Sequence, residues 1–201
     1  MKAIKFAWVL TLSAALSQAC HSPDQKWDSK SSADTLNNMK DSASDSSKSM
    51  SRSLVMKVSK DDAKFAVEAA NGGLAEVELG QLAQQKAMDS QVKNFGAMMV
   101  KDHTEANDKM KTIAQSKGIT LPSTLSNDEQ KLKTDLSSKS GKDFDKAYIE
   151  AMIDDHKEDI KTFQDAIQRL KDPDLKAFAT NTLPVLKMHL DAIQKIHDSM
   201  K

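Results

Sequence analysis

The sequence has very little of what disulfide-linked or sheet-rich proteins depend on. One cysteine in 201 residues excludes an intramolecular disulfide, and aromatic residues make up only 4% of the chain. Six glycines and four prolines leave long stretches without a residue that breaks a helix. Strands favour aromatic and β-branched side chains, whereas alanine, lysine and glutamine favour helices. The composition therefore predicts an all-α protein.

The chain also lacks an excess of charge of either sign. Its 29 basic and 29 acidic residues give a formal net charge of zero, so nothing attracts nucleic acid to the chain as a whole. The sequence contains no basic stretch interleaved with aromatic residues, no phosphate-binding loop and no nucleophile–base–acid pattern. We expect no nucleic-acid partner. Enzymatic activity is expected only through a bound metal, and binding without turnover is favoured.

The first twenty residues have the features of an export signal. Lys2 and Lys5 precede an apolar run over residues 6–16, which is too short to span a bilayer comfortably. Cys20 follows in a pattern that resembles the lipobox of bacterial lipoproteins, although the usual leucine is displaced by one position. The alternative is an ordinary signal peptide and an unpaired thiol. We expect a lipoprotein signal peptide over residues 1–19, a lipid on Cys20, and a protein anchored in the bacterial cell envelope, at the outer membrane or on the periplasmic face.

The next segment is rich in serine, aspartate and lysine. Residues 20–58 contain too few apolar side chains to offset the entropy of ordering them. We expect a flexible tether, with a root-mean-square reach of about 35 Å, between the lipidated cysteine and a domain over residues 59–201.

Apolar residues recur at three- and four-residue spacing in that domain and predict four long helices. Ser59 is suited to begin the first helix and either Asp89 or Ser90 the second, and Gly118 is suited to end the second. A long connection follows, with a short helix begun by Ser126, and the pair Asp172-Pro173 separates the last two long helices. The predicted helices cover residues 59–87, 90–117, 143–170 and 175–200.

Four polar residues interrupt the apolar stripes of these helices: Glu76, His103, His156 and His189. Each lies near the middle of a different helix. Glu76 stands 13 residues before Asp89 and His103 stands 14 after it, and the two later histidines are placed similarly about the second turn. At about 1.5 Å per residue, all four side chains reach the same level of a bundle.

Polar groups are too costly to bury without partners for this arrangement to be incidental. Three imidazoles and a carboxylate are enough to bind one transition metal, and Zn, Cu, Fe and Mn are all compatible. Met99, Met152 and Met188 lie near the histidines and would allow copper, although methionine at helical spacing usually fills a core. The alternative is a hydrogen-bonded Glu–His network without a metal, which would fix how the helices align.

Several segments resemble an uncharacterised bacterial family, the domain-of-unknown-function 4142 family, often labelled "predicted outer membrane protein". They are the run 71–80, the Asp-His pairs at 102–103 and 155–156, and the segment 183–189. The resemblance implies a ferritin-like four-helix bundle in the bacterial envelope and no established activity. Ferritin-like metal proteins carry Glu-x-x-His on two helices. Val100 and Leu186 occupy the glutamate positions before His103 and His189, so we do not expect a di-iron centre.

Other polar residues are weaker candidates. Glu78 is one step off the stripe that contains Glu76, while His21 and His197 lie outside the helix midpoints. Asp102 and Asp155 directly precede histidines, and helical spacing predicts that they face outward.

These features favour a lipid-anchored metal-binding protein that acts in sequestration, sensing or stress protection. The alternative is a non-catalytic structural or interaction module, whose Glu–His cluster is a buried polar network.

Overall fold

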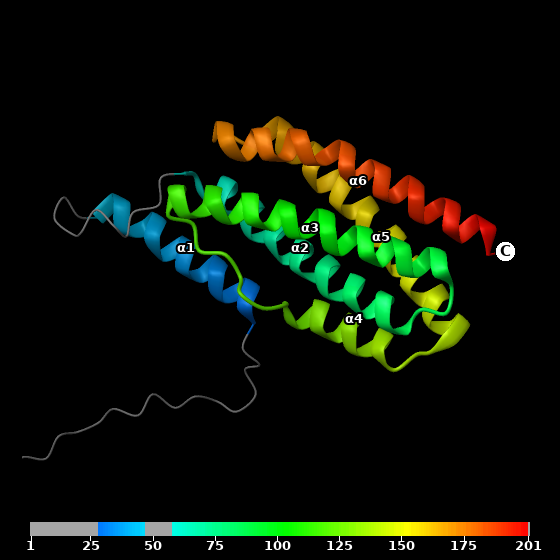
Figure 1. Cartoon of the computed structure of the whole chain (residues 1–201). Coiled ribbons are helices and arrows are strands. Elements are labelled where there is room, and N and C mark those ends of the chain that lie inside the picture. Colours follow the sequence, from blue (N-terminus) through cyan, green and yellow to red (C-terminus); the bar gives the residue numbers. More distant parts are fainter. Residues whose placement is uncertain (1–27, 47–57, 201) are drawn as a thin grey trace, which may run out of the picture.

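The computed structural model describes residues 28–46 and 58–200, and within these ranges every regular element is an α-helix (Figure 1). The all-α prediction is confirmed. The six helices are α1 (Ser29–Ser46), α2 (Lys60–Lys86), α3 (Ser90–Lys117), α4 (Asn127–Ser137), α5 (Gly141–Arg169) and α6 (Pro173–Ser199).

The helix boundaries follow from local capping. The side chains of Ser59, Asp89, Ser126 and Asp172 each accept a hydrogen bond from a backbone N–H in the first turn of α2, α3, α4 and α6. Gly118 ends α3 with a φ of 73°, which glycine adopts without strain. The helix expected to begin near residue 143 begins two residues earlier, since α5 starts at Gly141.

Helices α2, α3, α5 and α6 form a bundle in which α2 packs on α3 and α5, and α6 packs on the same two helices. The carboxylate of Asp145, near the start of α5, accepts hydrogen bonds from the N–H groups of Met88 (2.9 Å) and Asp89 (2.8 Å). The connection that contains α4 therefore returns along the bundle to the α2–α3 turn. The two antiparallel helix pairs are thus joined by one long crossover, a path that the length of the connection had allowed but not required.

The apolar core has two parts, one on each side of the polar level. One cluster gathers around Phe65, Phe163 and Phe178, and the other around Phe95 and Tyr148. The second cluster also buries Met99 and Met152 completely. These two methionines fill the core, as their spacing predicted.

Glycines allow α2 and α3 to approach closely. A methyl group on Gly80 would lie 2.6 Å from the carbonyl oxygen of Gly96, and one on Gly96 would lie 2.7 Å from that of Gly80. Glycine in a helix costs about 1 kcal/mol relative to alanine, and here this close contact accounts for it.

Helix α1 differs from the flexible tether expected over residues 20–58. Its side chains Ser29, Ala33 and Asn37 are buried. Asn37 Nδ2 donates to the carbonyl of Thr120 (2.9 Å) and its Oδ1 accepts from the N–H of Thr120 (2.8 Å), which fastens α1 to the connection after α3. The prediction of flexibility was wrong for residues 29–46. The buried stripe of this helix consists of small and polar side chains, so the sequence shows no apolar periodicity there. Cys20 and the predicted signal peptide lie outside the described residues.

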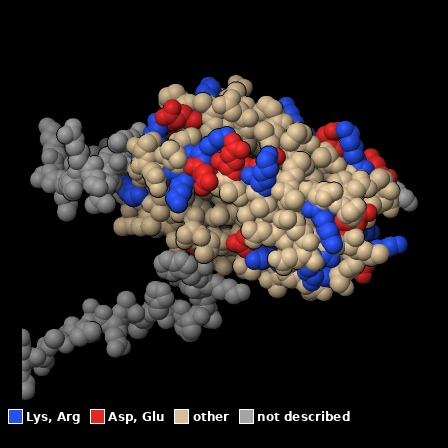
Figure 2. Space-filling view, viewed as in Figure 1, with Lys and Arg blue, Asp and Glu red and all other residues tan. Residues whose placement is uncertain are grey.

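On the face shown in Figure 2, acidic and basic side chains intermingle. Among the residues that the structure describes, no helix combines the length and the apolar character needed to cross a membrane.

Candidate metal centre

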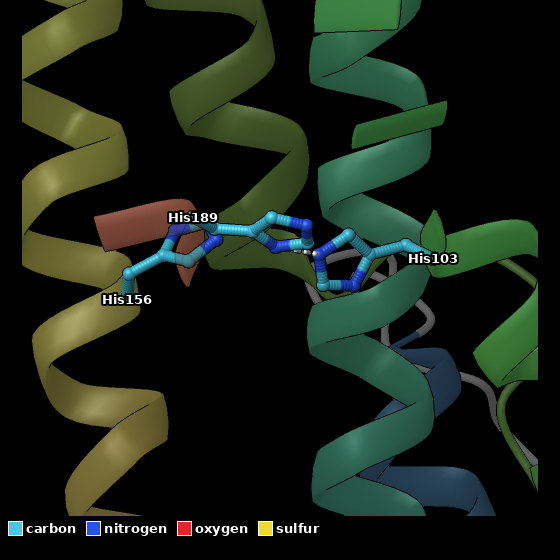
Figure 3. Close-up of side chains that lie close together, drawn as sticks. All are labelled: His103, His156 and His189. Atoms are coloured by element: carbon cyan, nitrogen blue, oxygen red, sulfur yellow. Dashed lines mark hydrogen bonds between the residues drawn. The ribbon is translucent and has the colours of Figure 1, made fainter. Parts of the chain in front are cut away.

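The bundle brings the four predicted polar side chains to one level. Glu76 comes from α2, His103 from α3, His156 from α5 and His189 from α6, and none is more than 5% exposed. In Figure 3 the three imidazole rings point toward one another from three helices. Their ring centroids are 5.2 to 6.0 Å apart. In each helix pair, the two polar residues lie at similar distances along the chain from the turn between the helices, so their side chains reach the same level.

One nitrogen of each ring faces away from the other rings and lies beside an oxygen. His103 Nδ1 is 2.6 Å from Glu76 Oε2, and His189 Nε2 is 3.0 Å from Asp102 Oδ2. His156 Nδ1 is 2.9 Å from the carbonyl oxygen of Met152. Oxygen atoms of this kind accept N–H bonds, so they favour the tautomers that carry the proton on these three nitrogens.

The remaining nitrogens, His103 Nε2, His156 Nε2 and His189 Nδ1, are then lone pairs that converge on one point. His103 Nε2 and His189 Nδ1 are 3.3 Å apart, and His156 Nε2 has no hydrogen-bond partner. We call His103, His156 and His189 the three-histidine centre. One potential ligand atom from each lies within 4.8 Å of the others.

With all three rings neutral and Asp102 ionised, protons alone do not satisfy this arrangement. A proton on Glu76 Oε2 would let His103 donate through Nε2 to His189, but His156 Nε2 would still lack a donor. A proton on Glu76 Oε1, which is 3.4 Å from His156 Nε2, would leave the lone pairs of His103 and His189 facing each other. Buried acceptors without donors are costly, whereas a cation would serve all three nitrogens. Tetrahedral coordination with bonds of about 2.0 Å places ligand atoms about 3.3 Å apart, which is the separation of His103 Nε2 and His189 Nδ1.

Burial keeps the histidines neutral, which is the form that binds metals. It lowers the pKa of His103 to about 4, although Asp159 and Asp102 oppose the shift. Burial, with the nearby His103 and His189, lowers the pKa of His156 to about 3. Burial also lowers the pKa of His189, and its bond to Asp102 opposes the change.

The pKa of Glu76 is shifted in the opposite direction. Its complete burial, together with the negative charge of Glu129, raises its pKa well above the usual range, and Asp155 opposes the shift. An ionised Glu76 therefore calls for a positive partner, which a metal ion in the adjacent three-histidine centre would supply.

The sequence did not point to Asp102, which was expected to face outward. Its side chain, 18% exposed, reaches sideways to His189 across the α3–α6 contact. The repeated Asp-His pair was the available signal. Glu78 forms an ion pair with Lys133 (2.7 Å) and lies outside the centre, and His197 lies beside Asp198.

A cavity of about 620 Å³ lies between α3 and α6 and reaches the centre. His103 and His189 line it together with Asp102 and the half-exposed Met188. Solvent and small ions therefore have a path to two of the three histidines.

The fold and the cluster together define a helical bundle with a buried set of metal-ligand side chains. The chain belongs to the family described as "Domain of unknown function (DUF4142)", whose model matches residues 47–196. The family predicted from the sequence is thereby confirmed. No curated protein matches the sequence.

Solved structures of helical proteins share the fold. A DUF305 fragment from Deinococcus radiodurans is 10% identical, with a TM-score of 0.62, over 69% of this chain and 96% of that chain. CopM in its Cu(I)-bound form is 16% identical, with a TM-score of 0.59, over 69% of this chain and 96% of that chain. CopM in its Cu(II)-bound form is 14% identical, with a TM-score of 0.60, over 70% of this chain and 97% of that chain. At these identities the likeness concerns the fold alone.

Proposed function

We propose that this protein binds one transition-metal ion, with copper the favoured ion, at His103, His156, His189 and Glu76. The observation that carries the proposal is the convergence of three buried imidazole nitrogens whose opposite nitrogens are each held by an oxygen. Oxygen partners of this kind orient metal-bound histidines and fix their tautomers. Glu76 holds His103 through Oε2. In this proposal its Oε1, which lies 3.4 Å from His156 Nε2, serves as the fourth ligand.

Copper is favoured over Zn, Fe and Mn for two reasons. Imidazole ligands suit Cu, Zn and Fe, whereas Mn prefers oxygen ligands, and of these divalent ions Cu²⁺ generally binds a given site most tightly. CopM, which shares the fold, is described in Cu(I)-bound, Cu(II)-bound and Ag-bound forms. The α3–α6 cavity gives the ion a path to and from the centre.

Binding, rather than turnover, is the function that this ligand set supports. Four protein ligands fill a tetrahedral site and leave no position for a substrate. We infer a role in sequestration, sensing or stress protection, exerted from the bacterial envelope by a protein held through a lipid on Cys20.

The proposal is tested by titrating the chelator-treated protein with Cu(I) in competition with a chromophoric chelator. The wild-type protein is expected to take up one equivalent of Cu(I), and the His103→Ala/His156→Ala double variant none. His197→Ala, at an exposed histidine outside the centre, is the matched control and is expected to bind as the wild type does. Circular dichroism establishes that each variant is folded.

Equal uptake by a folded double variant, or no uptake of Cu(I), Cu(II) or Zn by the wild type, would overturn the proposal. A metal-free polar network would then be the better account. It is favoured by the short 2.6 Å contact between Glu76 and His103 and by the raised pKa of Glu76. It predicts that single His→Leu changes are tolerated or stabilising.

A further inference from the structure

Met188 is an apolar residue that the packing of the bundle leaves open to solvent. It is 49% exposed, although it lies in the interior of α6 rather than at an end of the helix. In the described part of the chain, the other exposed large apolar residues lie in α1, at the α2–α3 turn or at the end of α6, and they are Leu36, Met39, Met88 and Met200. Met188 is thus the exposed methionine that calls for an explanation within the bundle.

The side chain of Met188 forms part of the wall of the α3–α6 cavity. Val185 and Asn181, which precede it on α6 by about one and two turns, line the same cavity. This periodicity identifies one face of α6 as the cavity wall, and Met188 belongs to that face. Its exposure is therefore exposure at the cavity and not on the outer surface of the bundle alone.

Met188 lies at the end of the cavity where the three-histidine centre is reached. Helices α3 and α6 run in opposite directions, since Asp102 contacts His189 while Lys117 pairs with Asp174. Asp174 lines the far end of the cavity, whereas Met188 directly precedes His189. The thioether and the centre therefore share one end of the cavity.

Sulfur separates Met188 from the other residues of the cavity wall. Among the described residues that line the cavity, Met188 alone carries sulfur, and the polar groups other than the imidazoles are carboxylates, hydroxyls, an amide and an amine. A thioether is a soft ligand that favours Cu(I). It has no proton to lose before it binds, and its flexible side chain can turn between solvent and the cavity.

We propose that Met188 is the entry ligand for a soft monovalent ion, Cu(I) or Ag(I). Its sulfur takes the ion from solvent at the cavity and passes it to the imidazoles of His103 and His189, a ligand exchange in which the oxidation state of the ion is unchanged. Met99 and Met152 are completely buried and do not line the cavity, so neither has this access. The inference rests on the proposed function, because the three-histidine centre is the destination of the ion.

Stopped-flow transfer of Cu(I) from a chromophoric chelator to the chelator-treated full chain tests the entry role. Met188→Leu keeps an apolar side chain of similar size and removes the sulfur. Its uptake rate is expected to fall about 10-fold, the scale typical of losing a residue beside a metal site, with one equivalent still taken up. Met188→Ala should be slowed as well. Met88→Leu, 66% exposed and outside the cavity, is the matched control and should behave as the wild type does.

A residue that merely narrows the cavity would give a different pattern. Met188→Leu would then take up Cu(I) at the wild-type rate and Met188→Ala would take it up faster. Either result would overturn the entry role, while uptake of one equivalent would leave the proposed function standing. Failure of the wild type to take up Cu(I) would overturn both.

The oxidation state of copper supplies a second readout. Cu(II) prefers nitrogen and oxygen ligands, so its uptake should proceed at the same rate in Met188→Leu as in the wild type. Equal slowing of Cu(I) and Cu(II) by this substitution would show that the sulfur is not what the ion meets, and would overturn the entry role.

Discussion

The orientation of each imidazole ring depends on a single oxygen outside the centre. Asp102 orients His189, Glu76 orients His103, and the backbone carbonyl of Met152 orients His156. The backbone carbonyl cannot be removed by substitution. Asp102 can, and unlike Glu76 it is not itself a proposed metal ligand.

The Asp102→Asn variant tests this positioning role. An amide can still accept from His189 Nε2, but it lacks the negative charge that strengthens the bond and makes the ring a better ligand. We expect Cu(I) affinity to fall by about 10- to 100-fold with the stoichiometry unchanged, as measured by chelator competition. Asp108→Asn, at an exposed position of the same helix, should leave the affinity unchanged. Indistinguishable affinities for the two variants would show that Asp102 has no part in orienting His189.

At this scale the sequence predicted the four polar side chains, because a charged or titratable residue on an apolar stripe is conspicuous. It did not predict the role of Asp102. Helical spacing places that residue about 100° from the stripe, and only the sideways reach of its carboxylate toward α6 brings it to His189. Asp155 was likewise expected to face outward, yet one of its oxygens lies within 4.8 Å of ligand atoms of Glu76 and His156.

Among the helices, the closest packing is between α2 and α3, where Gly80 and Gly96 face each other. This contact sets how near His103 comes to Glu76, because both residues lie on these two helices. Not every glycine of α2 is needed for the close approach of α2 and α3. Gly72 has ordinary space around it, with its nearest neighbour, Asp159, 3.8 Å from an added methyl group.

Two glycine substitutions test whether the contact between α2 and α3 requires glycine. Gly96→Ala would place a methyl group 2.7 Å from a backbone oxygen and 2.9 Å from Ala83 Cβ, which would force α2 and α3 apart. We expect the free energy of unfolding to fall by about 1–3 kcal/mol in denaturant titrations. Gly72→Ala is the matched control, and it should be neutral or stabilising by up to about 1 kcal/mol because alanine favours the helix. Equal effects of the two changes would contradict the packing account.

The sequence was a good guide to the long helices because capping residues mark their ends. Helix α1 was missed for a physical reason. Its buried stripe of Ser29, Ala33 and Asn37 is stabilised by hydrogen bonds to the connection after α3, and such tertiary contacts leave no apolar period in the sequence. The path of that connection was likewise open, since its length allowed either a crossing or a direct return.

In the whole molecule, two apolar clusters enclose a polar layer in which Glu76 Oε1 and His156 Nε2 have no hydrogen-bond partner. The α3–α6 cavity opens the layer on the imidazole side, and the partly exposed Asp155 opens it on the carboxylate side.

X-ray absorption spectroscopy of the Cu(I)-loaded protein is the most direct test of the central claim. The account predicts nitrogen or oxygen ligands at about 2.0 Å, with the outer scattering of imidazole rings from two or three histidines. A coordination shell dominated by sulfur, or one without imidazole scattering, would contradict it, because His103, His156 and His189 would then not be the residues that hold the metal.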